Sequence, residues 1–218
     1  VKAVLDRYGL QSPAMHSDLG TLRQRMPAIA AAAHVIGQRY VVLPSIPEAE
    51  RRTLDDYKRL ADDFNRIGAS AVAEGIRFAY HNHGYGLTAV DGQIPFQLIL
   101  EQTDPALVDL ELDIYWNTAG GGDPVAYLRA YPGRFPLMHL KDMTQRFPVP
   151  DNMDNPSAWI SLFPYISDAG SGVLDLTAII RQALQAGTQH FFLERDLAPD
   201  PVETLRKSYQ HLAGLRFQ

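Results

Sequence analysis

Short apolar runs alternate with longer amphipathic segments along the chain. Uninterrupted apolar runs such as Tyr40–Pro44 are typical of strands that are buried on both faces of a parallel sheet. Such runs predict strands at residues 9–16, 40–44, 77–83, 108–114, 136–140 and 190–194. Because these strands are separated by helix-like segments, the pattern predicts parallel βαβ units.

The segments between the predicted strands have helical periodicity. From Thr53 to Glu74, apolar residues recur at three- and four-residue spacing, which is typical of an amphipathic helix, and Gly75 then ends it. Other helices are expected at residues 1–8, 19–36, 96–102, 123–131, 174–186 and 201–215. Residues 144–172 are rich in Pro, Asp, Asn and Ser, and we interpret them as a long irregular segment that serves as a lid or substrate wall.

The number of units narrows the fold class within the α/β proteins. A closed (β/α)8 TIM barrel typically needs about 250 residues, whereas this chain has 218 residues and six predicted strand–helix units. We therefore predict a single domain over residues 1–218, a TIM barrel without its first two βα units. The chain opens on a helix-like segment at Val1 rather than on Met, so an upstream segment is expected to be missing.

Composition then removes several classes of function. A net charge of −5, a pI near 5.8 and the lack of any basic stripe argue against nucleic-acid or anionic-membrane partners. The absence of cysteine excludes disulfides, thiolate nucleophiles and thiolate-bound zinc. No apolar stretch reaches the roughly 20 residues that span a bilayer. We expect a cytoplasmic location, with export left open because a signal peptide would lie upstream; oligomerisation is also left open.

Acidic and imidazole side chains stand at the ends of the predicted strands. His81 and His83 end one strand, and Asp113, His139 and Glu194 end three later ones. Side chains at the carboxyl ends of parallel strands converge on the face where ligands bind. Carboxylates and imidazoles together suit a hard-to-borderline divalent metal ion. We therefore predict a metal site formed by Asp113, His139, Glu194 and one of the two histidines, with His81 as the first choice.

Each of these residues also has a purely structural interpretation. Asp113 could cap a turn or join a salt bridge. Glu194 could pair with Arg195, although neighbouring strand residues point to opposite faces. His139 and Lys141 share one strand face, where the ammonium could neutralise a developing oxyanion or could simply pair with the next aspartate.

Further residues near the strand ends are candidates for contact with a small substrate. His83, Asn82 and His16 lie at strand ends and could bind substrate. Trp116, just past Asp113, could form an apolar wall for a sugar ring or could pack in the core.

Five motifs together resemble the sugar phosphate isomerase/epimerase family of the xylose isomerase-like barrel group. They are Tyr80-His-Asn-His83, Glu111-Leu-Asp-Ile-Tyr-Trp116, the segment from Asp123 to Arg134, His139-Leu-Lys-Asp-Met143 and Phe192-Leu-Glu-Arg-Asp196. The resemblance extends over essentially the whole chain. It implies a (β/α)8 barrel with a divalent ion, commonly Mn, Co, Zn or Mg, bound at strands five to eight.

The resemblance also assigns roles to residues. Asp113, His139 and Glu194 match the ligand positions of the last three strands, whereas the fifth strand, which supplies a Glu in epimerases of the group, offers His81 and His83 here. The implied function is an isomerase or epimerase that acts on a sugar or sugar phosphate through an enediolate.

In that mechanism we expect Glu194, His81 and Lys141 to be catalytic. Dehydration or cleavage of a keto-sugar, inosose or keto-glycoside uses the same enolate, so a lyase is the first alternative. Two segments, Gly84–Leu87 and Gly170–Gly172, lack carboxylates that are common in relatives. A sugar-binding barrel without catalysis is therefore the second alternative.

Overall fold

The computed structural model describes residues 1–150, 153 and 155–216, and the chain forms two compact units. Unit 1 consists of Val1–His81 and Pro95–Leu110, and unit 2 consists of Asn82–Ile94 and Glu111–Gln218. Each unit contains a set of parallel strands with helices packed beside it. The single-domain organisation expected from the sequence stays a prediction.

Unit 1 is built on the strands that the first apolar runs predict. Its strands lie in the order β1 (Ala14–His16), β2 (Tyr40–Leu43), β3 (Arg77–His81) and the first half of β4 (Val108–Asp113). The β1–β2 and β2–β3 pairs are parallel, and every residue of β2 is buried. The helical elements are α1 (Lys2–Arg7), α2 (Leu19–Gln24), α3 (Met26–Ile36), η1 (Glu48–Glu50), α4 (Leu54–Ala73) and α5 (Pro95–Gln102).

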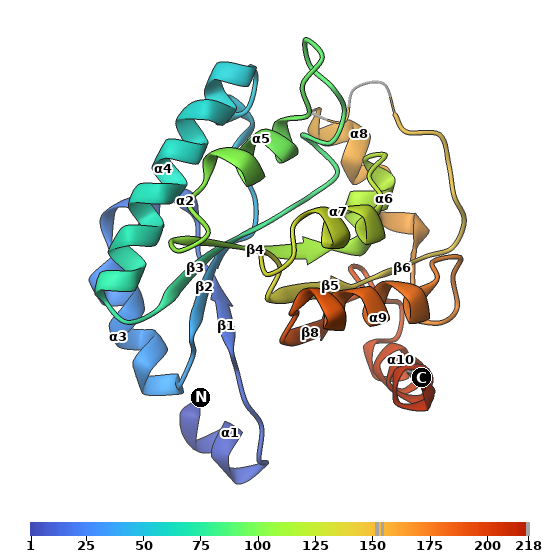
Figure 1. The fold of residues 1–218 in the computed structure, drawn as a ribbon. Helices are drawn as coiled ribbons and strands as arrows, with labels where there is room; N and C mark the ends of the chain where they lie inside the picture. The colour runs from blue at the N-terminus through green and yellow to red at the C-terminus, as the bar shows by residue number, and fades with distance from the viewer. Residues whose placement is uncertain (151–152, 154, 217–218) are drawn as a thin grey trace. The chain divides into compact units, whose positions relative to one another are not determined.

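The core of unit 1 forms where the apolar face of α4 meets the sheet, and α5 lies alongside α4 (Figure 1). The ring of Phe64 on α4 lies 5.4 Å from that of Phe78 and 5.2 Å from that of Tyr80, both on β3. Aromatic pairs of this kind add about 0.5–1.5 kcal/mol beyond the area that they bury. Gly68 lets α4 pack closely against the backbone at Leu107, because a Cβ at position 68 would collide with that backbone.

Helix α4 begins with a capping box at Thr53. The Thr53 hydroxyl accepts a hydrogen bond from the Asp56 backbone N–H at 3.2 Å, and the Asp56 carboxylate accepts one from the Thr53 N–H at 2.8 Å. We expect Thr53→Ala to lower the free energy of unfolding by about 1 kcal/mol, because a helix N-terminal N–H loses its partner. Urea denaturation measures the loss. The same substitution at exposed Thr88 is the control and should change stability by less than about 0.5 kcal/mol.

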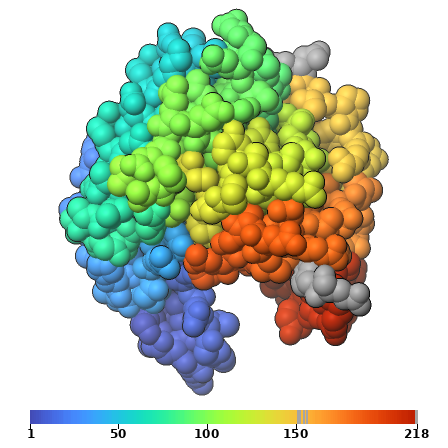
Figure 2. Space-filling view, viewed as in Figure 1, coloured from blue at the N-terminus to red at the C-terminus, as the bar shows by residue number. Residues whose placement is uncertain are grey.

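Unit 2 continues the parallel order with the second half of β4, then β5 (Leu137–Leu140) and β8 (His190–Leu193). A short antiparallel pair, β6 (Asp142–Met143) and β7 (Ile166–Ser167), forms a separate two-stranded sheet. The helical elements are α6 (Ile114–Ala119), α7 (Pro124–Ala130), α8 (Pro156–Ile160), η2 (Phe163–Tyr165), α9 (Leu176–Ala186) and α10 (Pro201–Gly214). Helices α7 and α9 pack side by side, and their side chains adjoin on the face that Figure 2 shows.

Several predicted boundaries are wrong for local reasons. The helix expected at 19–36 is two helices, because the backbone turns at Arg25 (φ −131°) and Pro27 stands at the start of α3. The strand expected to end at residue 83 ends at His81. The strand expected to reach residue 114 stops at Asp113, where α6 begins. Within residues 144–172 the structure forms β7, α8 and η2, while residues 151, 152 and 154 lie outside the described residues.

No helix in the described part of the chain combines the length and the apolar character that crossing a membrane requires.

Candidate functional site

Four of the predicted site residues come together in unit 2. Residues Asp113 and His139 are register partners on β4 and β5. Lys141 lies two residues beyond His139, and Glu194 directly follows β8. The convergence of strand ends predicted from the sequence is therefore present within this unit.

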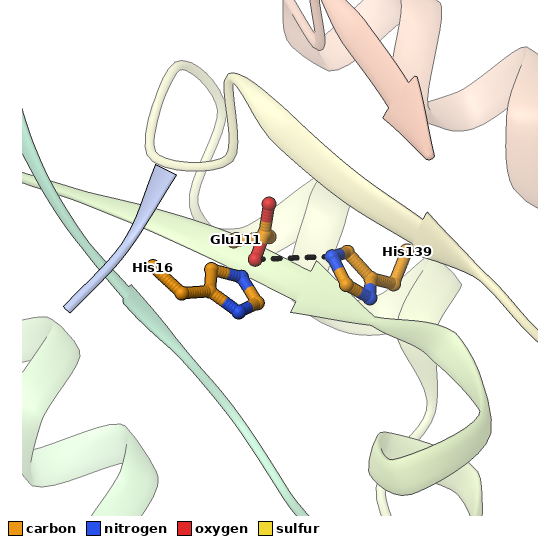
Figure 3. Close-up of side chains that lie close together, drawn as sticks. All are labelled: His16, Glu111 and His139. Atoms are coloured by element: carbon orange, nitrogen blue, oxygen red, sulfur yellow. Dashed lines mark ion pairs between the residues drawn. The ribbon is translucent and has the colours of Figure 1, made fainter. Parts of the chain in front are cut away.

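His139 is at the centre of the cluster. Its Nδ1 lies 2.5 Å from Glu194 Oε2 and 4.0 Å from Asp113 Oδ2. Its Nε2 lies 3.2 Å from Glu111 Oε2, the ion pair that Figure 3 marks. Burial by itself lowers the pKa of His139, but the hydrogen bonds to Glu111 and Glu194 and the surrounding negative charge outweigh it and raise that pKa to about 10.

Lys141 supplies a buried positive charge to the same cluster. Its Nζ lies 2.8 Å from Asp196 Oδ2, 2.9 Å from Glu194 Oε2 and 3.3 Å from Asp113 Oδ2. Burial lowers the pKa of Lys141, but the three carboxylates more than offset this and keep that pKa above its usual value. Lys141 is thus a fixed ammonium among carboxylates, and its bond to Asp196 replaces the pairing with Asp142 considered from the sequence.

Glu194 is the most accessible member of the cluster, with a side chain that is 39% exposed. Burial raises the pKa of Glu194, but the His139 hydrogen bond and the Lys141 charge reverse that effect and hold the pKa well below its usual range. Its neighbour Arg195 pairs with Asp168 at 2.5 Å. Glu194 is therefore an ionised carboxylate that faces the cluster rather than Arg195.

Asp113 both caps a helix, as the structural interpretation expects, and faces the charged cluster, as the functional interpretation expects. One carboxylate oxygen, Oδ1, caps α6 by accepting a hydrogen bond from the Trp116 N–H at 2.8 Å, while Oδ2 faces Lys141. The Asn82 amide accepts from the Asp113 N–H at 2.9 Å and donates to the Asp113 carbonyl at 3.3 Å. The Asn82 side chain thus makes the two backbone hydrogen bonds that a paired strand residue would make, and it holds Asp113 in place.

An aromatic cluster adjoins the carboxylates. Trp116 is fully buried, and its ring lies 5.5 Å from that of His83 and 5.8 Å from that of Trp159 on α8. The Lys141 Nζ lies 6.0 Å from the Trp116 ring. Trp159 shows that the long segment predicted as a substrate wall packs against this cluster.

His81 and His16 belong to unit 1, where their rings lie 6.0 Å apart. His81 is almost completely buried, and His16 is exposed. Their predicted roles, ligand and catalytic residue for His81 and substrate contact for His16, stay predictions.

Two carboxylates of the cluster were not predicted as site residues. Glu111 is buried with only 1% of its side chain exposed, and Asp196 bonds to Lys141. Each lies two residues from a predicted site residue, Asp113 or Glu194. Strand alternation places positions i and i+2 on one face and is the signal that could have found Glu111.

The donor atoms of this cluster are of the kinds that bind divalent metal ions. Carboxylate oxygens of Asp113 and Glu194 and the Nδ1 of His139 form the mixed oxygen and nitrogen set that Zn²⁺, Mn²⁺ or Co²⁺ accepts.

Asp142, next to Lys141, anchors the segment with the Gly-Ser-Gly sequence. Its Oδ2 accepts hydrogen bonds from the N–H groups of Gly170 at 2.9 Å and Gly172 at 3.0 Å, and Oδ1 accepts from Leu174 at 3.2 Å. This carboxylate therefore has a structural task beside the site.

The tight approach at Gly172 leads to a stability prediction. A Cβ at Gly172 would collide with the Asp142 carboxylate and the Met143 carbonyl. We expect Gly172→Ala to lower the free energy of unfolding by about 1–3 kcal/mol, the usual cost of overpacking. Gly214→Ala is the control, because a Cβ there meets no atom within 4 Å. Equal denaturation midpoints for the two variants would contradict the close approach at Gly172.

The geometry agrees with the comparison to known proteins. A family model described as the xylose isomerase-like TIM barrel matches residues 1–215. The chain belongs to this family. The family has the (β/α)8 barrel fold predicted from the sequence. The strand order of this chain, β1-β2-β3-β4 in unit 1 and β4-β5-β8 in unit 2, agrees with that fold.

Three known proteins are similar to this chain. An inosose dehydratase of Clostridium tetani is 31% identical over 132 residues, which is 60% of this chain but 43% of the relative, so the match spans less than half of that protein. A sugar phosphate isomerase/epimerase from Parabacteroides distasonis has a TM-score of 0.79 at 23% identity, covering 98% of this chain and 80% of that one. The IOLI protein, solved with a bound zinc atom, has a TM-score of 0.71 at 15% identity, covering 97% and 80%.

Proposed function

We propose that the protein is a divalent-metal-dependent isomerase or epimerase that moves a proton on a sugar or sugar phosphate through an enediolate. The observation that carries the proposal is the cluster of Asp113, His139 and Glu194 with the Lys141 ammonium among their carboxylates. The carbohydrate-modifying relatives support the substrate class, and the zinc-containing IOLI protein supports a divalent ion.

In the proposed mechanism Asp113, His139 and Glu194 would hold the ion, and His81 stays the predicted fourth ligand. When bound, the ion would act as a Lewis acid that polarises the substrate carbonyl. Glu194 would remove the proton next to the carbonyl, since it is the most accessible carboxylate of the cluster. Lys141 stabilises negative charge on the substrate oxygen, and Asp196 holds the ammonium in position.

A lyase is the second candidate, and the inosose dehydratase relative favours it. Elimination of water from a keto-sugar or inosose begins with the same proton removal. Product analysis separates the reactions. NMR and mass spectrometry of the reaction mixture would show an isomer of unchanged mass if the first proposal holds, and loss of one water if the protein is a dehydratase.

His81 and His83 are expected to respond differently to substitution. We propose that His81 is a metal ligand, so His81→Gln should weaken Zn²⁺ binding by about tenfold or more. His83 lies among the rings of Tyr85, Trp116 and Trp159, which suits a substrate wall. His83→Gln should therefore raise KM and leave the Zn²⁺ affinity within about threefold of the original. Calorimetric titration with Zn²⁺ and steady-state kinetics give the two readouts, and a reversed pattern would exchange the two roles.

A further inference from the structure

Glu111 is a buried carboxylate that the proposed mechanism does not use. It lies in β4 two residues before Asp113, and its side chain is 1% exposed. A charged group is costly to bury unless it is paired and hydrogen-bonded. One of its contacts is with the Nε2 of His139, at 3.2 Å (Figure 3).

The two nitrogens of His139 face different groups. Nδ1 faces Glu194 and Asp113, the two carboxylates proposed as ligands, whereas Nε2 faces Glu111. A neutral imidazole offers one lone pair to a metal, and the hydrogen bond made by the other nitrogen decides which nitrogen offers it. A carboxylate at Nε2 therefore keeps the proton on Nε2, so that the lone pair for the ion is on Nδ1, the nitrogen that faces Glu194 and Asp113.

We propose that Glu111 is a positioning residue that holds His139 in the Nε2-protonated form, so that Nδ1 is the metal-ligating atom. This inference rests on the proposed function, because it assigns a nitrogen of a proposed ligand. Glu111 would touch neither the ion nor the substrate. It would raise metal affinity by fixing the ring orientation and by making the imidazole more basic.

Metal affinity in three variants tests the inference. Co²⁺ is titrated into the protein and followed by visible absorption, with the melting temperature recorded for each variant. Glu111→Ala is expected to weaken Co²⁺ binding by about 10–100-fold. Glu111→Gln, whose amide oxygen can still accept from Nε2, should recover most of that loss. Asp109→Ala, which removes the Arg77-paired carboxylate from the same strand, is the matched control and should leave Co²⁺ affinity within about threefold.

NMR of the Zn²⁺-loaded protein labelled with ¹⁵N at histidine supplies a direct readout. The original protein and Glu111→Gln should show His139 with a proton on Nε2 and the metal at Nδ1. A metal-bound Nε2 would overturn the inference, as would equal Co²⁺ affinity in Glu111→Ala and the original protein. A loss of affinity in Glu111→Gln as large as in Glu111→Ala would also overturn it, because Glu111 would then be a direct ligand. If the original protein binds neither metal, it is the proposed function that fails.

Discussion

Replacing Asp113 with Asn is expected to weaken divalent-metal binding at least about 100-fold and to abolish turnover. The substitution removes one negative oxygen from the ligand set, and metal affinity depends on deprotonated ligands. Asp113 is fully buried, and its Oδ2 also lies 3.3 Å from the Lys141 ammonium, so the charge of the whole cluster changes. Isothermal titration with Mn²⁺, Co²⁺ and Zn²⁺ measures the affinity.

The same variant should keep its fold, since Asn is as good an N-cap as Asp. The amide oxygen can accept the Trp116 N–H bond that begins α6. Asp123 offers a matched control, because its Oδ1 caps α7 by accepting from Val125 at 2.9 Å and Ala126 at 3.3 Å. Asp123→Asn makes the same chemical change at the same kind of position, and it should leave metal affinity and turnover within about twofold. Full metal affinity in Asp113→Asn would remove Asp113 from the ligand set.

Lys141→Met is expected to lower kcat by about 10²–10³-fold, the usual effect of losing one group that stabilises a developing oxyanion. Methionine keeps the length of the side chain but leaves the carboxylates of Asp113, Glu194 and Asp196 without their ammonium. Without metal, these carboxylates repel one another and the melting temperature should fall. Added Zn²⁺ should restore part of that loss, because a divalent cation offsets the same charges.

The kinetic pattern distinguishes a catalytic Lys141 from a structural one. A catalytic ammonium predicts a large fall in kcat for the metal-loaded variant, with KM changed by less than about fivefold. Lys207→Met is the control, since Lys207 is 51% exposed and pairs with Glu203 on α10. If the metal-loaded Lys141→Met variant turns over at the original rate, Lys141 serves only to balance charge.

Much of the fold could be predicted because the core strands are continuous apolar runs. Strand β2, for example, is buried along its whole length, and its sequence is accordingly an uninterrupted apolar run that predicts a strand. Boundaries were less predictable where polar side chains end an element. The strand toward residue 83 stops at His81 because the Asn82 amide bonds to the backbone of Asp113, a residue 31 positions away.

The candidate site was predictable where chemistry coincides with a strand end, as for Asp113, His139 and Glu194. Glu111 was missed because it lies inside the strand, where burying a carboxylate is expected to be energetically costly. In addition, the His139 imidazole that it contacts belongs to another strand. The contact of Trp159 with Trp116 joins residues far apart in sequence through a segment without a clear periodic pattern. Such long-range pairings depend on tertiary packing, which local patterns do not specify.

Solvent-proton exchange is the most direct test of a metal-dependent enediolate mechanism. The Mn²⁺- or Zn²⁺-loaded protein would be incubated in D2O with a panel of keto- and aldo-sugars, their phosphates and inososes, and ¹H NMR would follow the proton next to each carbonyl. The mechanism predicts that at least one substrate exchanges this proton for deuterium, that chelator stops the exchange, and that Asp113→Asn does not catalyse it. Tight metal binding without exchange into any member of the panel would contradict the mechanism and favour a sugar-binding barrel.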